Sequence, residues 1–223
     1  MADDSLPSGT TSPASGGVAV VAVGACRALE AFLRAAPEAG EGVGLPQFVE
    51  RWVPGVRESM LSLTDSPMDF DKFLEVLRAL AREGVDYVLV GAVALGIHGL
   101  VRATEDVDLF IRPDGENVER LKRALRSVWD DPEIASITAQ DLAGEYPTVR
   151  YGPPGEGFVI DLLSRLGSAF AFEDLEAETV SLEGVPVRVA TPATLYRMKK
   201  GTVRPIDRAD AAALREKFGL LEE

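Results

Sequence analysis

The sequence contains one cysteine and one histidine among its 223 residues. A single cysteine excludes an intramolecular disulfide framework, and it also excludes a zinc cage built from cysteines. Because there is only one histidine as well, any metal site in this chain must be built from carboxylates. Oxygen ligands of that kind suit Mg²⁺ or Mn²⁺.

Basic residues are in the minority. Lys and Arg total 23 against 36 Asp and Glu, so the formal net charge is −13. This excludes a basic coat over the whole surface, which is a usual footprint of a nucleic-acid-binding domain. A local basic patch is still compatible with the composition.

Long apolar runs are missing too. No segment reaches the roughly 18 unbroken apolar residues that a membrane-spanning helix needs. The nearest is the run 18–26, VAVVAVGAC. The residues before it include Asp3 and Asp4 but neither Lys nor Arg, whereas a signal peptide needs a positive start. We therefore expect a cytoplasmic protein with no membrane partner.

The composition divides the chain into four parts. Residues 1–17 are rich in Ser, Gly, Pro and Asp, and we expect a disordered tail because they cannot bury enough apolar surface. Residues 18–66 are expected to form an N-terminal helical segment with a Gly- and Pro-rich break. Residues 67–166 form the expected core. Residues 167–223 add a hairpin and helices that complete the site.

Apolar periodicity predicts the elements of the core. Residues 70–81 place apolar side chains on one face at the helical period, between an N-cap at Asp69 and a terminating Gly84. A hairpin turn is expected at Glu183-Gly184. The order of elements predicts an α/β (α+β) fold, a mixed sheet flanked by helices with N- and C-terminal helical additions. The predicted helices are 70–81, 92–98, 117–129, 192–200 and 207–218, and the predicted strands are 86–90, 107–111, 148–151, 158–163, 179–182 and 185–189.

Two acidic residues lie at the start of the predicted strand 107–111. Side chains alternate across a strand, so Asp106 and Asp108 point the same way, roughly 7 Å apart. Two such carboxylates repel each other, and a divalent cation between them reverses that penalty. The same spacing also fits a solvated strand edge or an acidic turn.

A third acidic residue, Asp161, lies in the middle of the apolar strand 158–163. A carboxylate buried there without a partner is costly, so Asp161 either is hydrogen-bonded for structural reasons or faces a cation. If its strand lies beside the one that carries Asp106 and Asp108, the three carboxylates converge. They would then form an oxygen-only site for one or two Mg²⁺ ions.

Other candidate residues precede the acidic pair. Gly91 begins a turn into a helix, where the backbone can approach a ligand and N–H groups can bind phosphate, although a simple tight turn explains it too. Arg102 suits either a bidentate phosphate contact or an ion pair with Glu105 or Asp106. The only histidine, His98, lies on a short apolar helix, where a packing or hydrogen-bonding role is favoured over that of a general base.

These motifs together resemble the signature of the DNA polymerase β-type nucleotidyltransferases. The run Val90-Gly91-Ala92 is followed after thirteen residues by Asp106-Val107-Asp108-Leu109, with another acid on a later strand. The longer pattern is similar to the minimal bacterial nucleotidyltransferases of the AbiEii and MenT toxin type, over about residues 70–220. It comprises Gly91, Ala92, Ala94, His98, Gly99, Arg102, Thr104, Asp106 and Asp108, and later Leu195, Met198, Lys199, Arg204, Pro205, Asp207, Asp210 and Leu214.

The resemblance implies a metal site and a phosphate site. Asp106 and Asp108 would hold both of two Mg²⁺ (or Mn²⁺) ions, and Asp161 would hold the catalytic ion and help to deprotonate the acceptor hydroxyl. The turn at Gly91-Ala92 would contact the nucleotide phosphates. The family often has Ser or Gly at the second position of this turn, so Ala92 leaves the backbone N–H but removes a phosphate-contacting hydroxyl.

The remaining positions of the pattern imply nucleotide contacts. Arg102 and Thr104 would bind the nucleotide, and Lys199 would neutralise the triphosphate with help from Arg204. Asp207 fits the N-cap of the last helix, which it would anchor together with Asp210. The window 195–208 has a net charge of +4, which leaves −17 for the rest of the chain. This basic cluster fits either a phosphate-binding patch or a solvated helix face.

Three functions fit these observations. The first is a Mg²⁺-dependent enzyme that transfers NMP from NTP to an acceptor hydroxyl, as the toxin of a toxin–antitoxin pair acting on the 3′ end of tRNA, with an antitoxin protein as partner. The second keeps the chemistry but uses a small hydroxylated molecule, as the aminoglycoside nucleotidyltransferases do, or a protein; the overall acidity favours it. The third is a non-catalytic protein that binds nucleotide or a partner, and only Ala92 supports it.

Overall fold

The computed structural model describes residues 51–52, 69–144 and 147–221. The predicted tail at 1–17 lies outside these residues, as does the predicted helical segment at 18–66 except for its residues 51–52. Those two residues form a short strand, β1 (Arg51–Trp52), where a helix was expected. The reason is tertiary, because β1 pairs in parallel with the edge of strand β8, whose backbone groups would otherwise lack a partner on that side.

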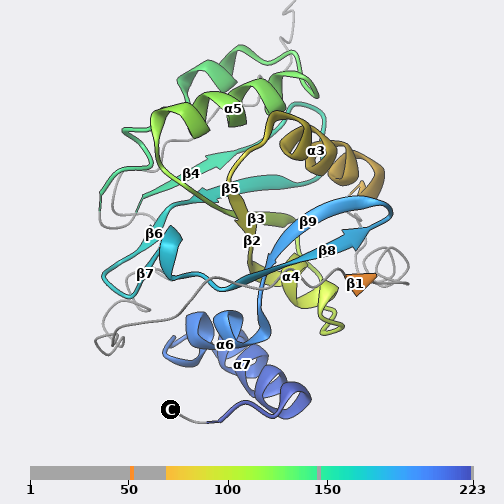
Figure 1. Cartoon of the computed structure of the whole chain (residues 1–223), viewed down its shortest axis with the longest axis vertical. Helices are drawn as coiled ribbons and strands as arrows, with labels where there is room; N and C mark the ends of the chain where they lie inside the picture. The colour runs from red at the N-terminus through yellow and green to blue at the C-terminus, as the bar shows by residue number, and fades with distance from the viewer. Residues whose placement is uncertain (1–50, 53–68, 145–146, 222–223) are drawn as a thin grey trace, which may run out of the picture.

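The core of the fold is a mixed sheet (Figure 1). Its strand order is β1-β8-β9-β2-β3-β5-β4, and a separate two-stranded sheet pairs β6 with β7. The mixed sheet flanked by helices confirms the predicted fold class, but the small second sheet was not predicted. The strands after β1 are β2 (Tyr87–Leu89), β3 (Asp106–Ile111), β4 (Thr148–Tyr151), β5 (Val159–Leu163), β6 (Arg165–Leu166), β7 (Phe170–Ala171), β8 (Ala177–Leu182) and β9 (Val185–Ala190).

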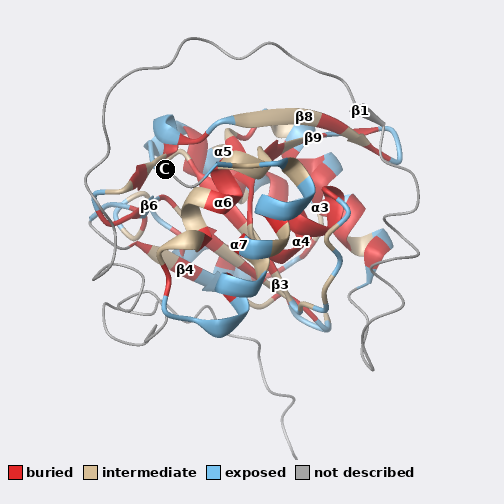
Figure 2. Ribbon diagram, turned by 90° about the horizontal axis from the view of Figure 1, so that it is seen from below, coloured by how far each residue is buried: buried red, intermediate tan, exposed pale blue. Residues whose placement is uncertain are grey.

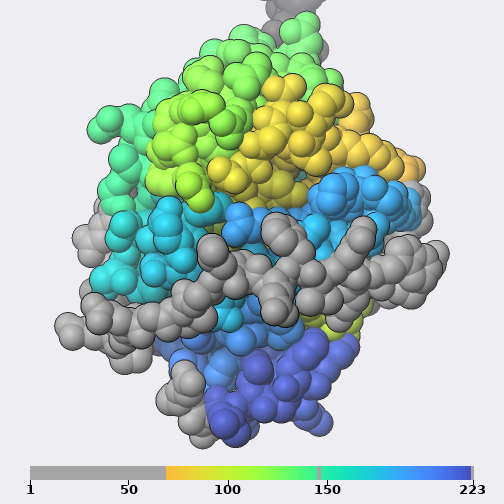
Figure 3. Space-filling model, viewed as in Figure 1, coloured from red at the N-terminus to blue at the C-terminus, as the bar shows by residue number. Residues whose placement is uncertain are grey.

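Helices cover both sides of this sheet. Figures 1 and 3 show α3 and α5 at one end of the molecule and α6 and α7 at the other, with the sheet between them. Buried residues concentrate where helices meet the sheet (Figure 2). None of the helices in the described ranges has both the length and the apolar character that a membrane crossing requires. The helices are α3 (Phe70–Glu83), α4 (Gly91–Ile97), α5 (Gly115–Arg126), α6 (Pro192–Lys200) and α7 (Pro205–Phe218), with short 3₁₀ turns at Pro132–Ser136 and Phe172–Asp174.

Local signals determine where α3 begins and ends. The Asp69 side chain accepts a hydrogen bond from the backbone N–H of Lys72, so it is the predicted N-cap. Gly84 ends the helix in the left-handed conformation, at φ 64°. The apolar face between them is buried, with Phe73, Leu77 and Leu80 fully inaccessible to solvent.

Strand pairing places the acidic residues of β3 and β5 beside each other. β3 and β5 are parallel neighbours, and the Cα of Asp108 is the direct partner of the Cα of Asp161. β5 also pairs with β4 in an antiparallel hairpin, in which Arg150 is the partner of Asp161. The strand of Asp161 thus lies beside the strand of Asp106 and Asp108, which is the condition for the three carboxylates to converge.

The C-terminal part is a hairpin followed by two packed helices. Glu183 and Gly184 both have positive φ, at 47° and 79°, and close the β8–β9 hairpin where it was predicted. Helix α7 begins at Pro205, two residues before the predicted start, and its N-cap position is Arg204. The prediction that Asp207 is the N-cap is wrong, because proline favours the first helical position and places Asp207 inside the first turn.

Candidate active site

Three carboxylates lie on one face of the strand pair β3 and β5. Asp108 faces Asp161 across the pair, and Asp106 lies two residues earlier on the same face of β3. The alternate residues Val107 and Leu109 point the other way and are buried. The site therefore follows directly from the two-residue period of the strands and from the parallel register.

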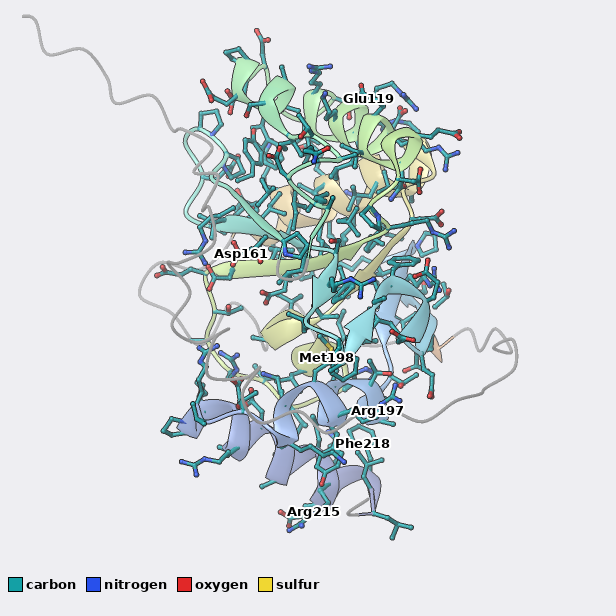
Figure 4. The ribbon with its side chains drawn as sticks, turned by 90° about the vertical axis from the view of Figure 1, so that its left-hand side faces the viewer. Glu119, Asp161, Arg197, Met198, Arg215 and Phe218 are labelled. Carbon is teal, nitrogen blue, oxygen red and sulfur yellow. The ribbon has the colours of Figure 1, made fainter. Side chains whose placement is uncertain are left out.

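These carboxylates line a cavity of about 360 Å³ between the sheet and the C-terminal helices. Asp161 lines it from the sheet and Met198 from α6, and Figure 4 labels both. Every predicted site residue except Ala92 contributes to the wall, so residues that are far apart in the sequence meet here. The full lining is Val90, Gly91, Arg102, Thr104, Asp106, Asp108, Thr148, Arg150, Asp161, Leu163, Leu166, Leu195, Met198, Lys199, Thr202, Arg204 and Asp207.

The carboxylates disfavour each other's ionisation. Burial raises the pKa of Asp108 to about 6, and the charges of Asp161 and Asp106 add to that shift. Burial also raises the pKa of Asp106, again with a contribution from Asp161. Lys199 and Arg102 oppose the shift at Asp108 but do not cancel it. Burial and mutual repulsion thus disfavour the charged carboxylates, and a divalent cation bound between them would offset that penalty.

Arg150 is a residue of this site that the sequence analysis did not single out. Its Nε donates to Oδ1 of Asp161 at 2.8 Å and its Nη2 to Oδ2 at 2.7 Å, which is a bidentate pair. The same Nη2 lies 3.3 Å from Oδ1 of Asp106. A signal was available in the strand 148–151, because Val149 and Tyr151 are apolar and alternate with Thr148 and Arg150, which line the cavity.

The turn before α4 brings the backbone close to the carboxylates. The N–H of Val90 donates to the backbone oxygen of Asp108 at 3.0 Å, and Gly91 follows with φ 68°. Gly91 lines the cavity, whereas the side chain of Ala92 is buried in the core, 2% exposed. A contact between Ala92 and a nucleotide would have to come from its backbone N–H and remains a prediction.

Lys199 is held by two acidic residues of α7. Its Nζ donates to Oδ1 of Asp207 at 2.8 Å and lies 2.9 Å from Oδ2 of Asp210. Arg102 approaches the same Asp210 oxygen at 3.3 Å, and Arg204 approaches Oδ2 of Asp207 at 3.6 Å. Arg102 therefore forms an ion pair, as one of the two predictions for it stated, but with a different residue. The packing of α7 brings Asp210 to it, where Glu105 or Asp106 was expected.

Two further predicted residues have structural contacts. The hydroxyl of Thr104 accepts from the N–H of Asp106 at 3.2 Å, which orders the chain where β3 begins. His98 is buried, with Nε2 2.8 Å from the backbone oxygen of Ala190 and Nδ1 3.7 Å from a carboxylate oxygen of Glu178. His98 does not line the cavity, which agrees with a packing and hydrogen-bonding role.

The donor set suits a hard divalent cation. Asp106, Asp108 and Asp161 offer only oxygen atoms, on one face, in an acidic surrounding that a cation would relieve. Across the described ranges, no group of three His, Cys, Asp or Glu side chains is arranged to hold a metal ion as it stands. The oxygens of Asp161 and Asp106 are instead turned to the guanidinium of Arg150. The guanidinium of Arg150 therefore already places a positive charge against two of these carboxylates.

Three carboxylates on adjacent strands of a mixed sheet, facing basic side chains of the C-terminal segment across a cavity, are what the resemblance to the nucleotidyltransferases led us to expect. The chain belongs to the family of the nucleotidyl transferase AbiEii toxin of type IV toxin–antitoxin systems, whose family model matches residues 72–203. The matched range includes Gly91, the three carboxylates and Lys199. The resemblance deduced from the sequence motifs is therefore confirmed, and the chain is a nucleotidyltransferase.

Two solved structures are similar to this chain at low identity. One is a protein from Thermotoga maritima described as a candidate nucleotidyltransferase, with 11% identity and a TM-score of 0.42 over 69% of this chain and 96% of that one. The other is an antigenic nucleotidyltransferase-like protein from Paracoccidioides brasiliensis, with 17% identity and a TM-score of 0.42 over 67% of this chain and 78% of that one. No curated protein matches the sequence.

Proposed function

We propose that this protein transfers a nucleoside monophosphate from an NTP to an acceptor hydroxyl and releases pyrophosphate, with Mg²⁺ or Mn²⁺ as cofactor. The observation that carries the proposal is the register that sets Asp108 opposite Asp161, with Asp106 on the same face. The opposite wall of the same cavity carries the basic side chains Lys199 and Arg204, together with Asp207. Acidic and basic walls that face each other suit a metal-bound triphosphate, which presents positive charge to one and negative charge to the other.

The carboxylates Asp106, Asp108 and Asp161 would hold the metal, with two ions expected. When bound, such ions supply neutralisation of the triphosphate and activation of the attacking hydroxyl. Asp161 would accept the proton of the acceptor hydroxyl while the oxygen of that hydroxyl bonds to the α-phosphorus. The bond between the α-phosphorus and the bridging oxygen breaks, and pyrophosphate leaves with that electron pair.

The cationic wall would orient the triphosphate. Arg204 is the residue best placed for this role, because its side chain is 51% exposed and its ion pair with Asp207 is long, at 3.6 Å. Lys199 would act mainly by holding α6 and α7 together, because Asp207 and Asp210 already neutralise its charge. Arg102, with a side chain 29% exposed at the cavity, would assist from the loop before β3.

The acceptor we propose first is RNA, at the 3′ end of tRNA, as the motif resemblance to the AbiEii and MenT toxin type implies, and basic residues of α6 and α7 are compatible with it. Family membership supports an antitoxin protein as partner. A cytoplasmic location is part of the same proposal. Four basic residues, Arg197, Lys200, Arg204 and Arg208, lie on or beside α6 and α7, and Arg204 lines the cavity. The net charge of −13 favours the second candidate, a small hydroxylated acceptor or a protein.

The test is transfer of label from each α-³²P-NTP, with Mg²⁺, to total RNA. The wild type is compared with Asp106→Asn/Asp108→Asn, and Asp130→Asn, which alters an exposed aspartate outside the cavity, is the control. Label on tRNA-sized RNA with the wild type and the control alone supports the RNA acceptor. Pyrophosphate release that appears only with small hydroxylated molecules or proteins supports the second candidate. No release of pyrophosphate with any NTP and acceptor overturns the proposal.

Partner and toxicity are tested in cells. Growth arrest on expression, relieved by the product of a neighbouring gene, is expected for a toxin with its antitoxin. Unchanged growth on expression of the wild type would count against the toxin assignment while leaving the transfer chemistry to the first test.

A further inference from the structure

We infer that Arg150 is a displaceable counter-ion, which occupies the place of the divalent cation at the carboxylates and leaves them when that cation binds. This inference rests on the proposed function, because it takes Asp106, Asp108 and Asp161 as the metal ligands. It adds a competition between a side chain of the protein and the metal. The expected consequence is that the protein binds metal more weakly than its three carboxylates alone would.

The strand register delivers the guanidinium to this place. Arg150 on β4 is the direct partner of Asp161 on β5, which is in turn the partner of Asp108 on β3. One cationic and two acidic side chains thus form a row across three adjacent strands. The planar guanidinium engages both oxygens of Asp161 and reaches one oxygen of Asp106 at 3.3 Å. It therefore contacts two of the three carboxylates that a metal ion would need.

Exposure makes this ion pair replaceable. The Arg150 side chain is 48% exposed, and so is much of Asp106, at 43%, whereas the bidentate partner Asp161 is 14% exposed. The exposed member of the main pair is thus the arginine, the group that has to leave. β4 is the last strand of the sheet order, so Arg150 enters the site from an edge. A long side chain on an edge strand can turn outward into solvent without disturbing the core, which keeps the cost of its leaving low when a metal ion takes over the carboxylates.

Lys199, another basic residue of the cavity, is held differently. Lys199 and its partner Asp207 are each only 9% exposed, and Lys199 contacts a second carboxylate of the same helix, Asp210. Removing Lys199 would leave Asp207 and Asp210 with only their longer pairs to Arg204 and Arg102, so its position is fixed. Unlike Lys199, Arg150 contacts carboxylates that the proposed function assigns to the metal.

The test is Mn²⁺ binding to the full chain after treatment with EDTA, without nucleotide, followed by the EPR signal of free Mn²⁺. Arg150→Gln is expected to lower the Kd for Mn²⁺ by about five- to tenfold, the effect of removing a bidentate but partly exposed competitor. Arg150→Lys, which keeps the charge but loses the fork, should give an intermediate Kd. Arg123→Gln is the matched control, because it breaks an Arg–Glu83 pair between α5 and α3, away from the cavity, and should leave the Kd unchanged.

A second readout separates displacement from a purely structural role. In EDTA, Arg150→Gln should have a lower Tm than the wild type, because Asp161 and Asp106 then lack their counter-ion. Saturating Mn²⁺ should remove that difference, since the metal takes over the same oxygens. A Kd equal to or higher than that of the wild type, or a Tm deficit that persists in saturating Mn²⁺, overturns the inference.

The outcomes also separate this inference from the proposed function. If the wild type binds Mn²⁺, Asp108→Asn abolishes binding and Arg150→Gln changes nothing, the metal site stands and the inference fails. If neither the wild type nor Arg150→Gln binds Mn²⁺, both fail. Arg150→Lys decides the same question should Arg150→Gln not fold.

Discussion

Gly91 has no room for a side chain because the carboxylate of Asp108 takes the space. A Cβ at Gly91 would lie 1.9 Å from Oδ2 of Asp108, and the backbone has φ +68° there. Gly91→Ala must therefore strain the backbone and displace the carboxylate. We expect a loss of about 2 to 4 kcal/mol in the free energy of unfolding, measured by urea denaturation, together with loss of transfer activity.

Substitutions of two other glycines separate the effect of backbone strain from that of the steric conflict with Asp108. Gly84→Ala imposes a comparable positive φ, +64°, with nothing within 4 Å of the new Cβ, so it measures the backbone strain alone, about 1 kcal/mol. Gly96→Ala places a methyl group in open space within α4 and should stabilise the protein by about 0.5 to 1 kcal/mol. Equal losses for Gly91→Ala and Gly84→Ala would show that the conflict with Asp108 is absent.

Asp108 should make the metal-free protein less stable as the pH rises. Its pKa in the folded protein is about 6, above the ordinary 3.8, so the folded state binds the proton more tightly than the unfolded state does. Its favourable contribution is complete below pH 3.8 and is lost as the pH rises through 6. Asp108→Asn should therefore gain stability relative to the wild type over that range, reaching about 3 kcal/mol at neutral pH.

The measurement is urea unfolding in EDTA between pH 4.5 and 8, with transfer activity assayed in parallel. The variant should be inactive although it is more stable. Asp130→Asn controls for the loss of one formal charge at an exposed position. A stability difference that does not grow with pH would contradict the assignment of the shift to burial beside Asp161 and Asp106.

Lys199 should be essential for the stability of the C-terminal helices. Lys199→Met leaves Asp207 and Asp210 without their buried partner, and breaking a buried pair in this way costs about 3 to 5 kcal/mol. Thermal and urea denaturation measure the loss. Lys72→Met, which removes an exposed partner of Glu75 on α3, should not change stability measurably. A small effect of Lys199→Met with strongly reduced activity would instead indicate that Lys199 acts mainly on the substrate.

His98 should be dispensable for chemistry. His98→Gln disturbs the contacts with Ala190 and Glu178 and should reduce the free energy of unfolding by about 1 to 2 kcal/mol. Because His98 does not line the cavity, kcat should stay within about twofold of the wild type and the pH profile of the rate should be unchanged. A tenfold loss of kcat in a folded variant would restore the histidine as a candidate base.

Local features of the fold could be predicted from the sequence because their causes are local. The strand at 148–151, the cap at Asp69 and the turn at Glu183-Gly184 each depend on residues a few positions apart. The parallel pairing of β3 with β5 joins Asp108 to a residue 53 positions later, and no local pattern specifies it. The three acidic residues could be named in advance, but their convergence depended on this long-range register.

The role of Arg150 was out of reach for a related reason. Alternation along 148–151 shows which side chains leave the core, but it does not show that the adjacent strand offers Asp161. Lys199 was expected to meet a triphosphate, and Asp207 and Asp210 to anchor a helix. Only the packing of α6 on α7 joins these separate expectations into one ion cluster.

The β4–β5 hairpin has a consequence for how the chain assembles. Arg150 and Asp161 are 11 positions apart, whereas Arg150 and Asp106 are 44 apart. Hairpins form within microseconds, before distant segments of a chain have met. Asp161 is therefore expected to acquire its cationic partner locally and to reach β3 as part of a neutralised pair. Repulsion among the three carboxylates would oppose their assembly during folding. Because Asp161 arrives already paired with Arg150, a newly synthesised chain can bring them together before it binds a metal ion.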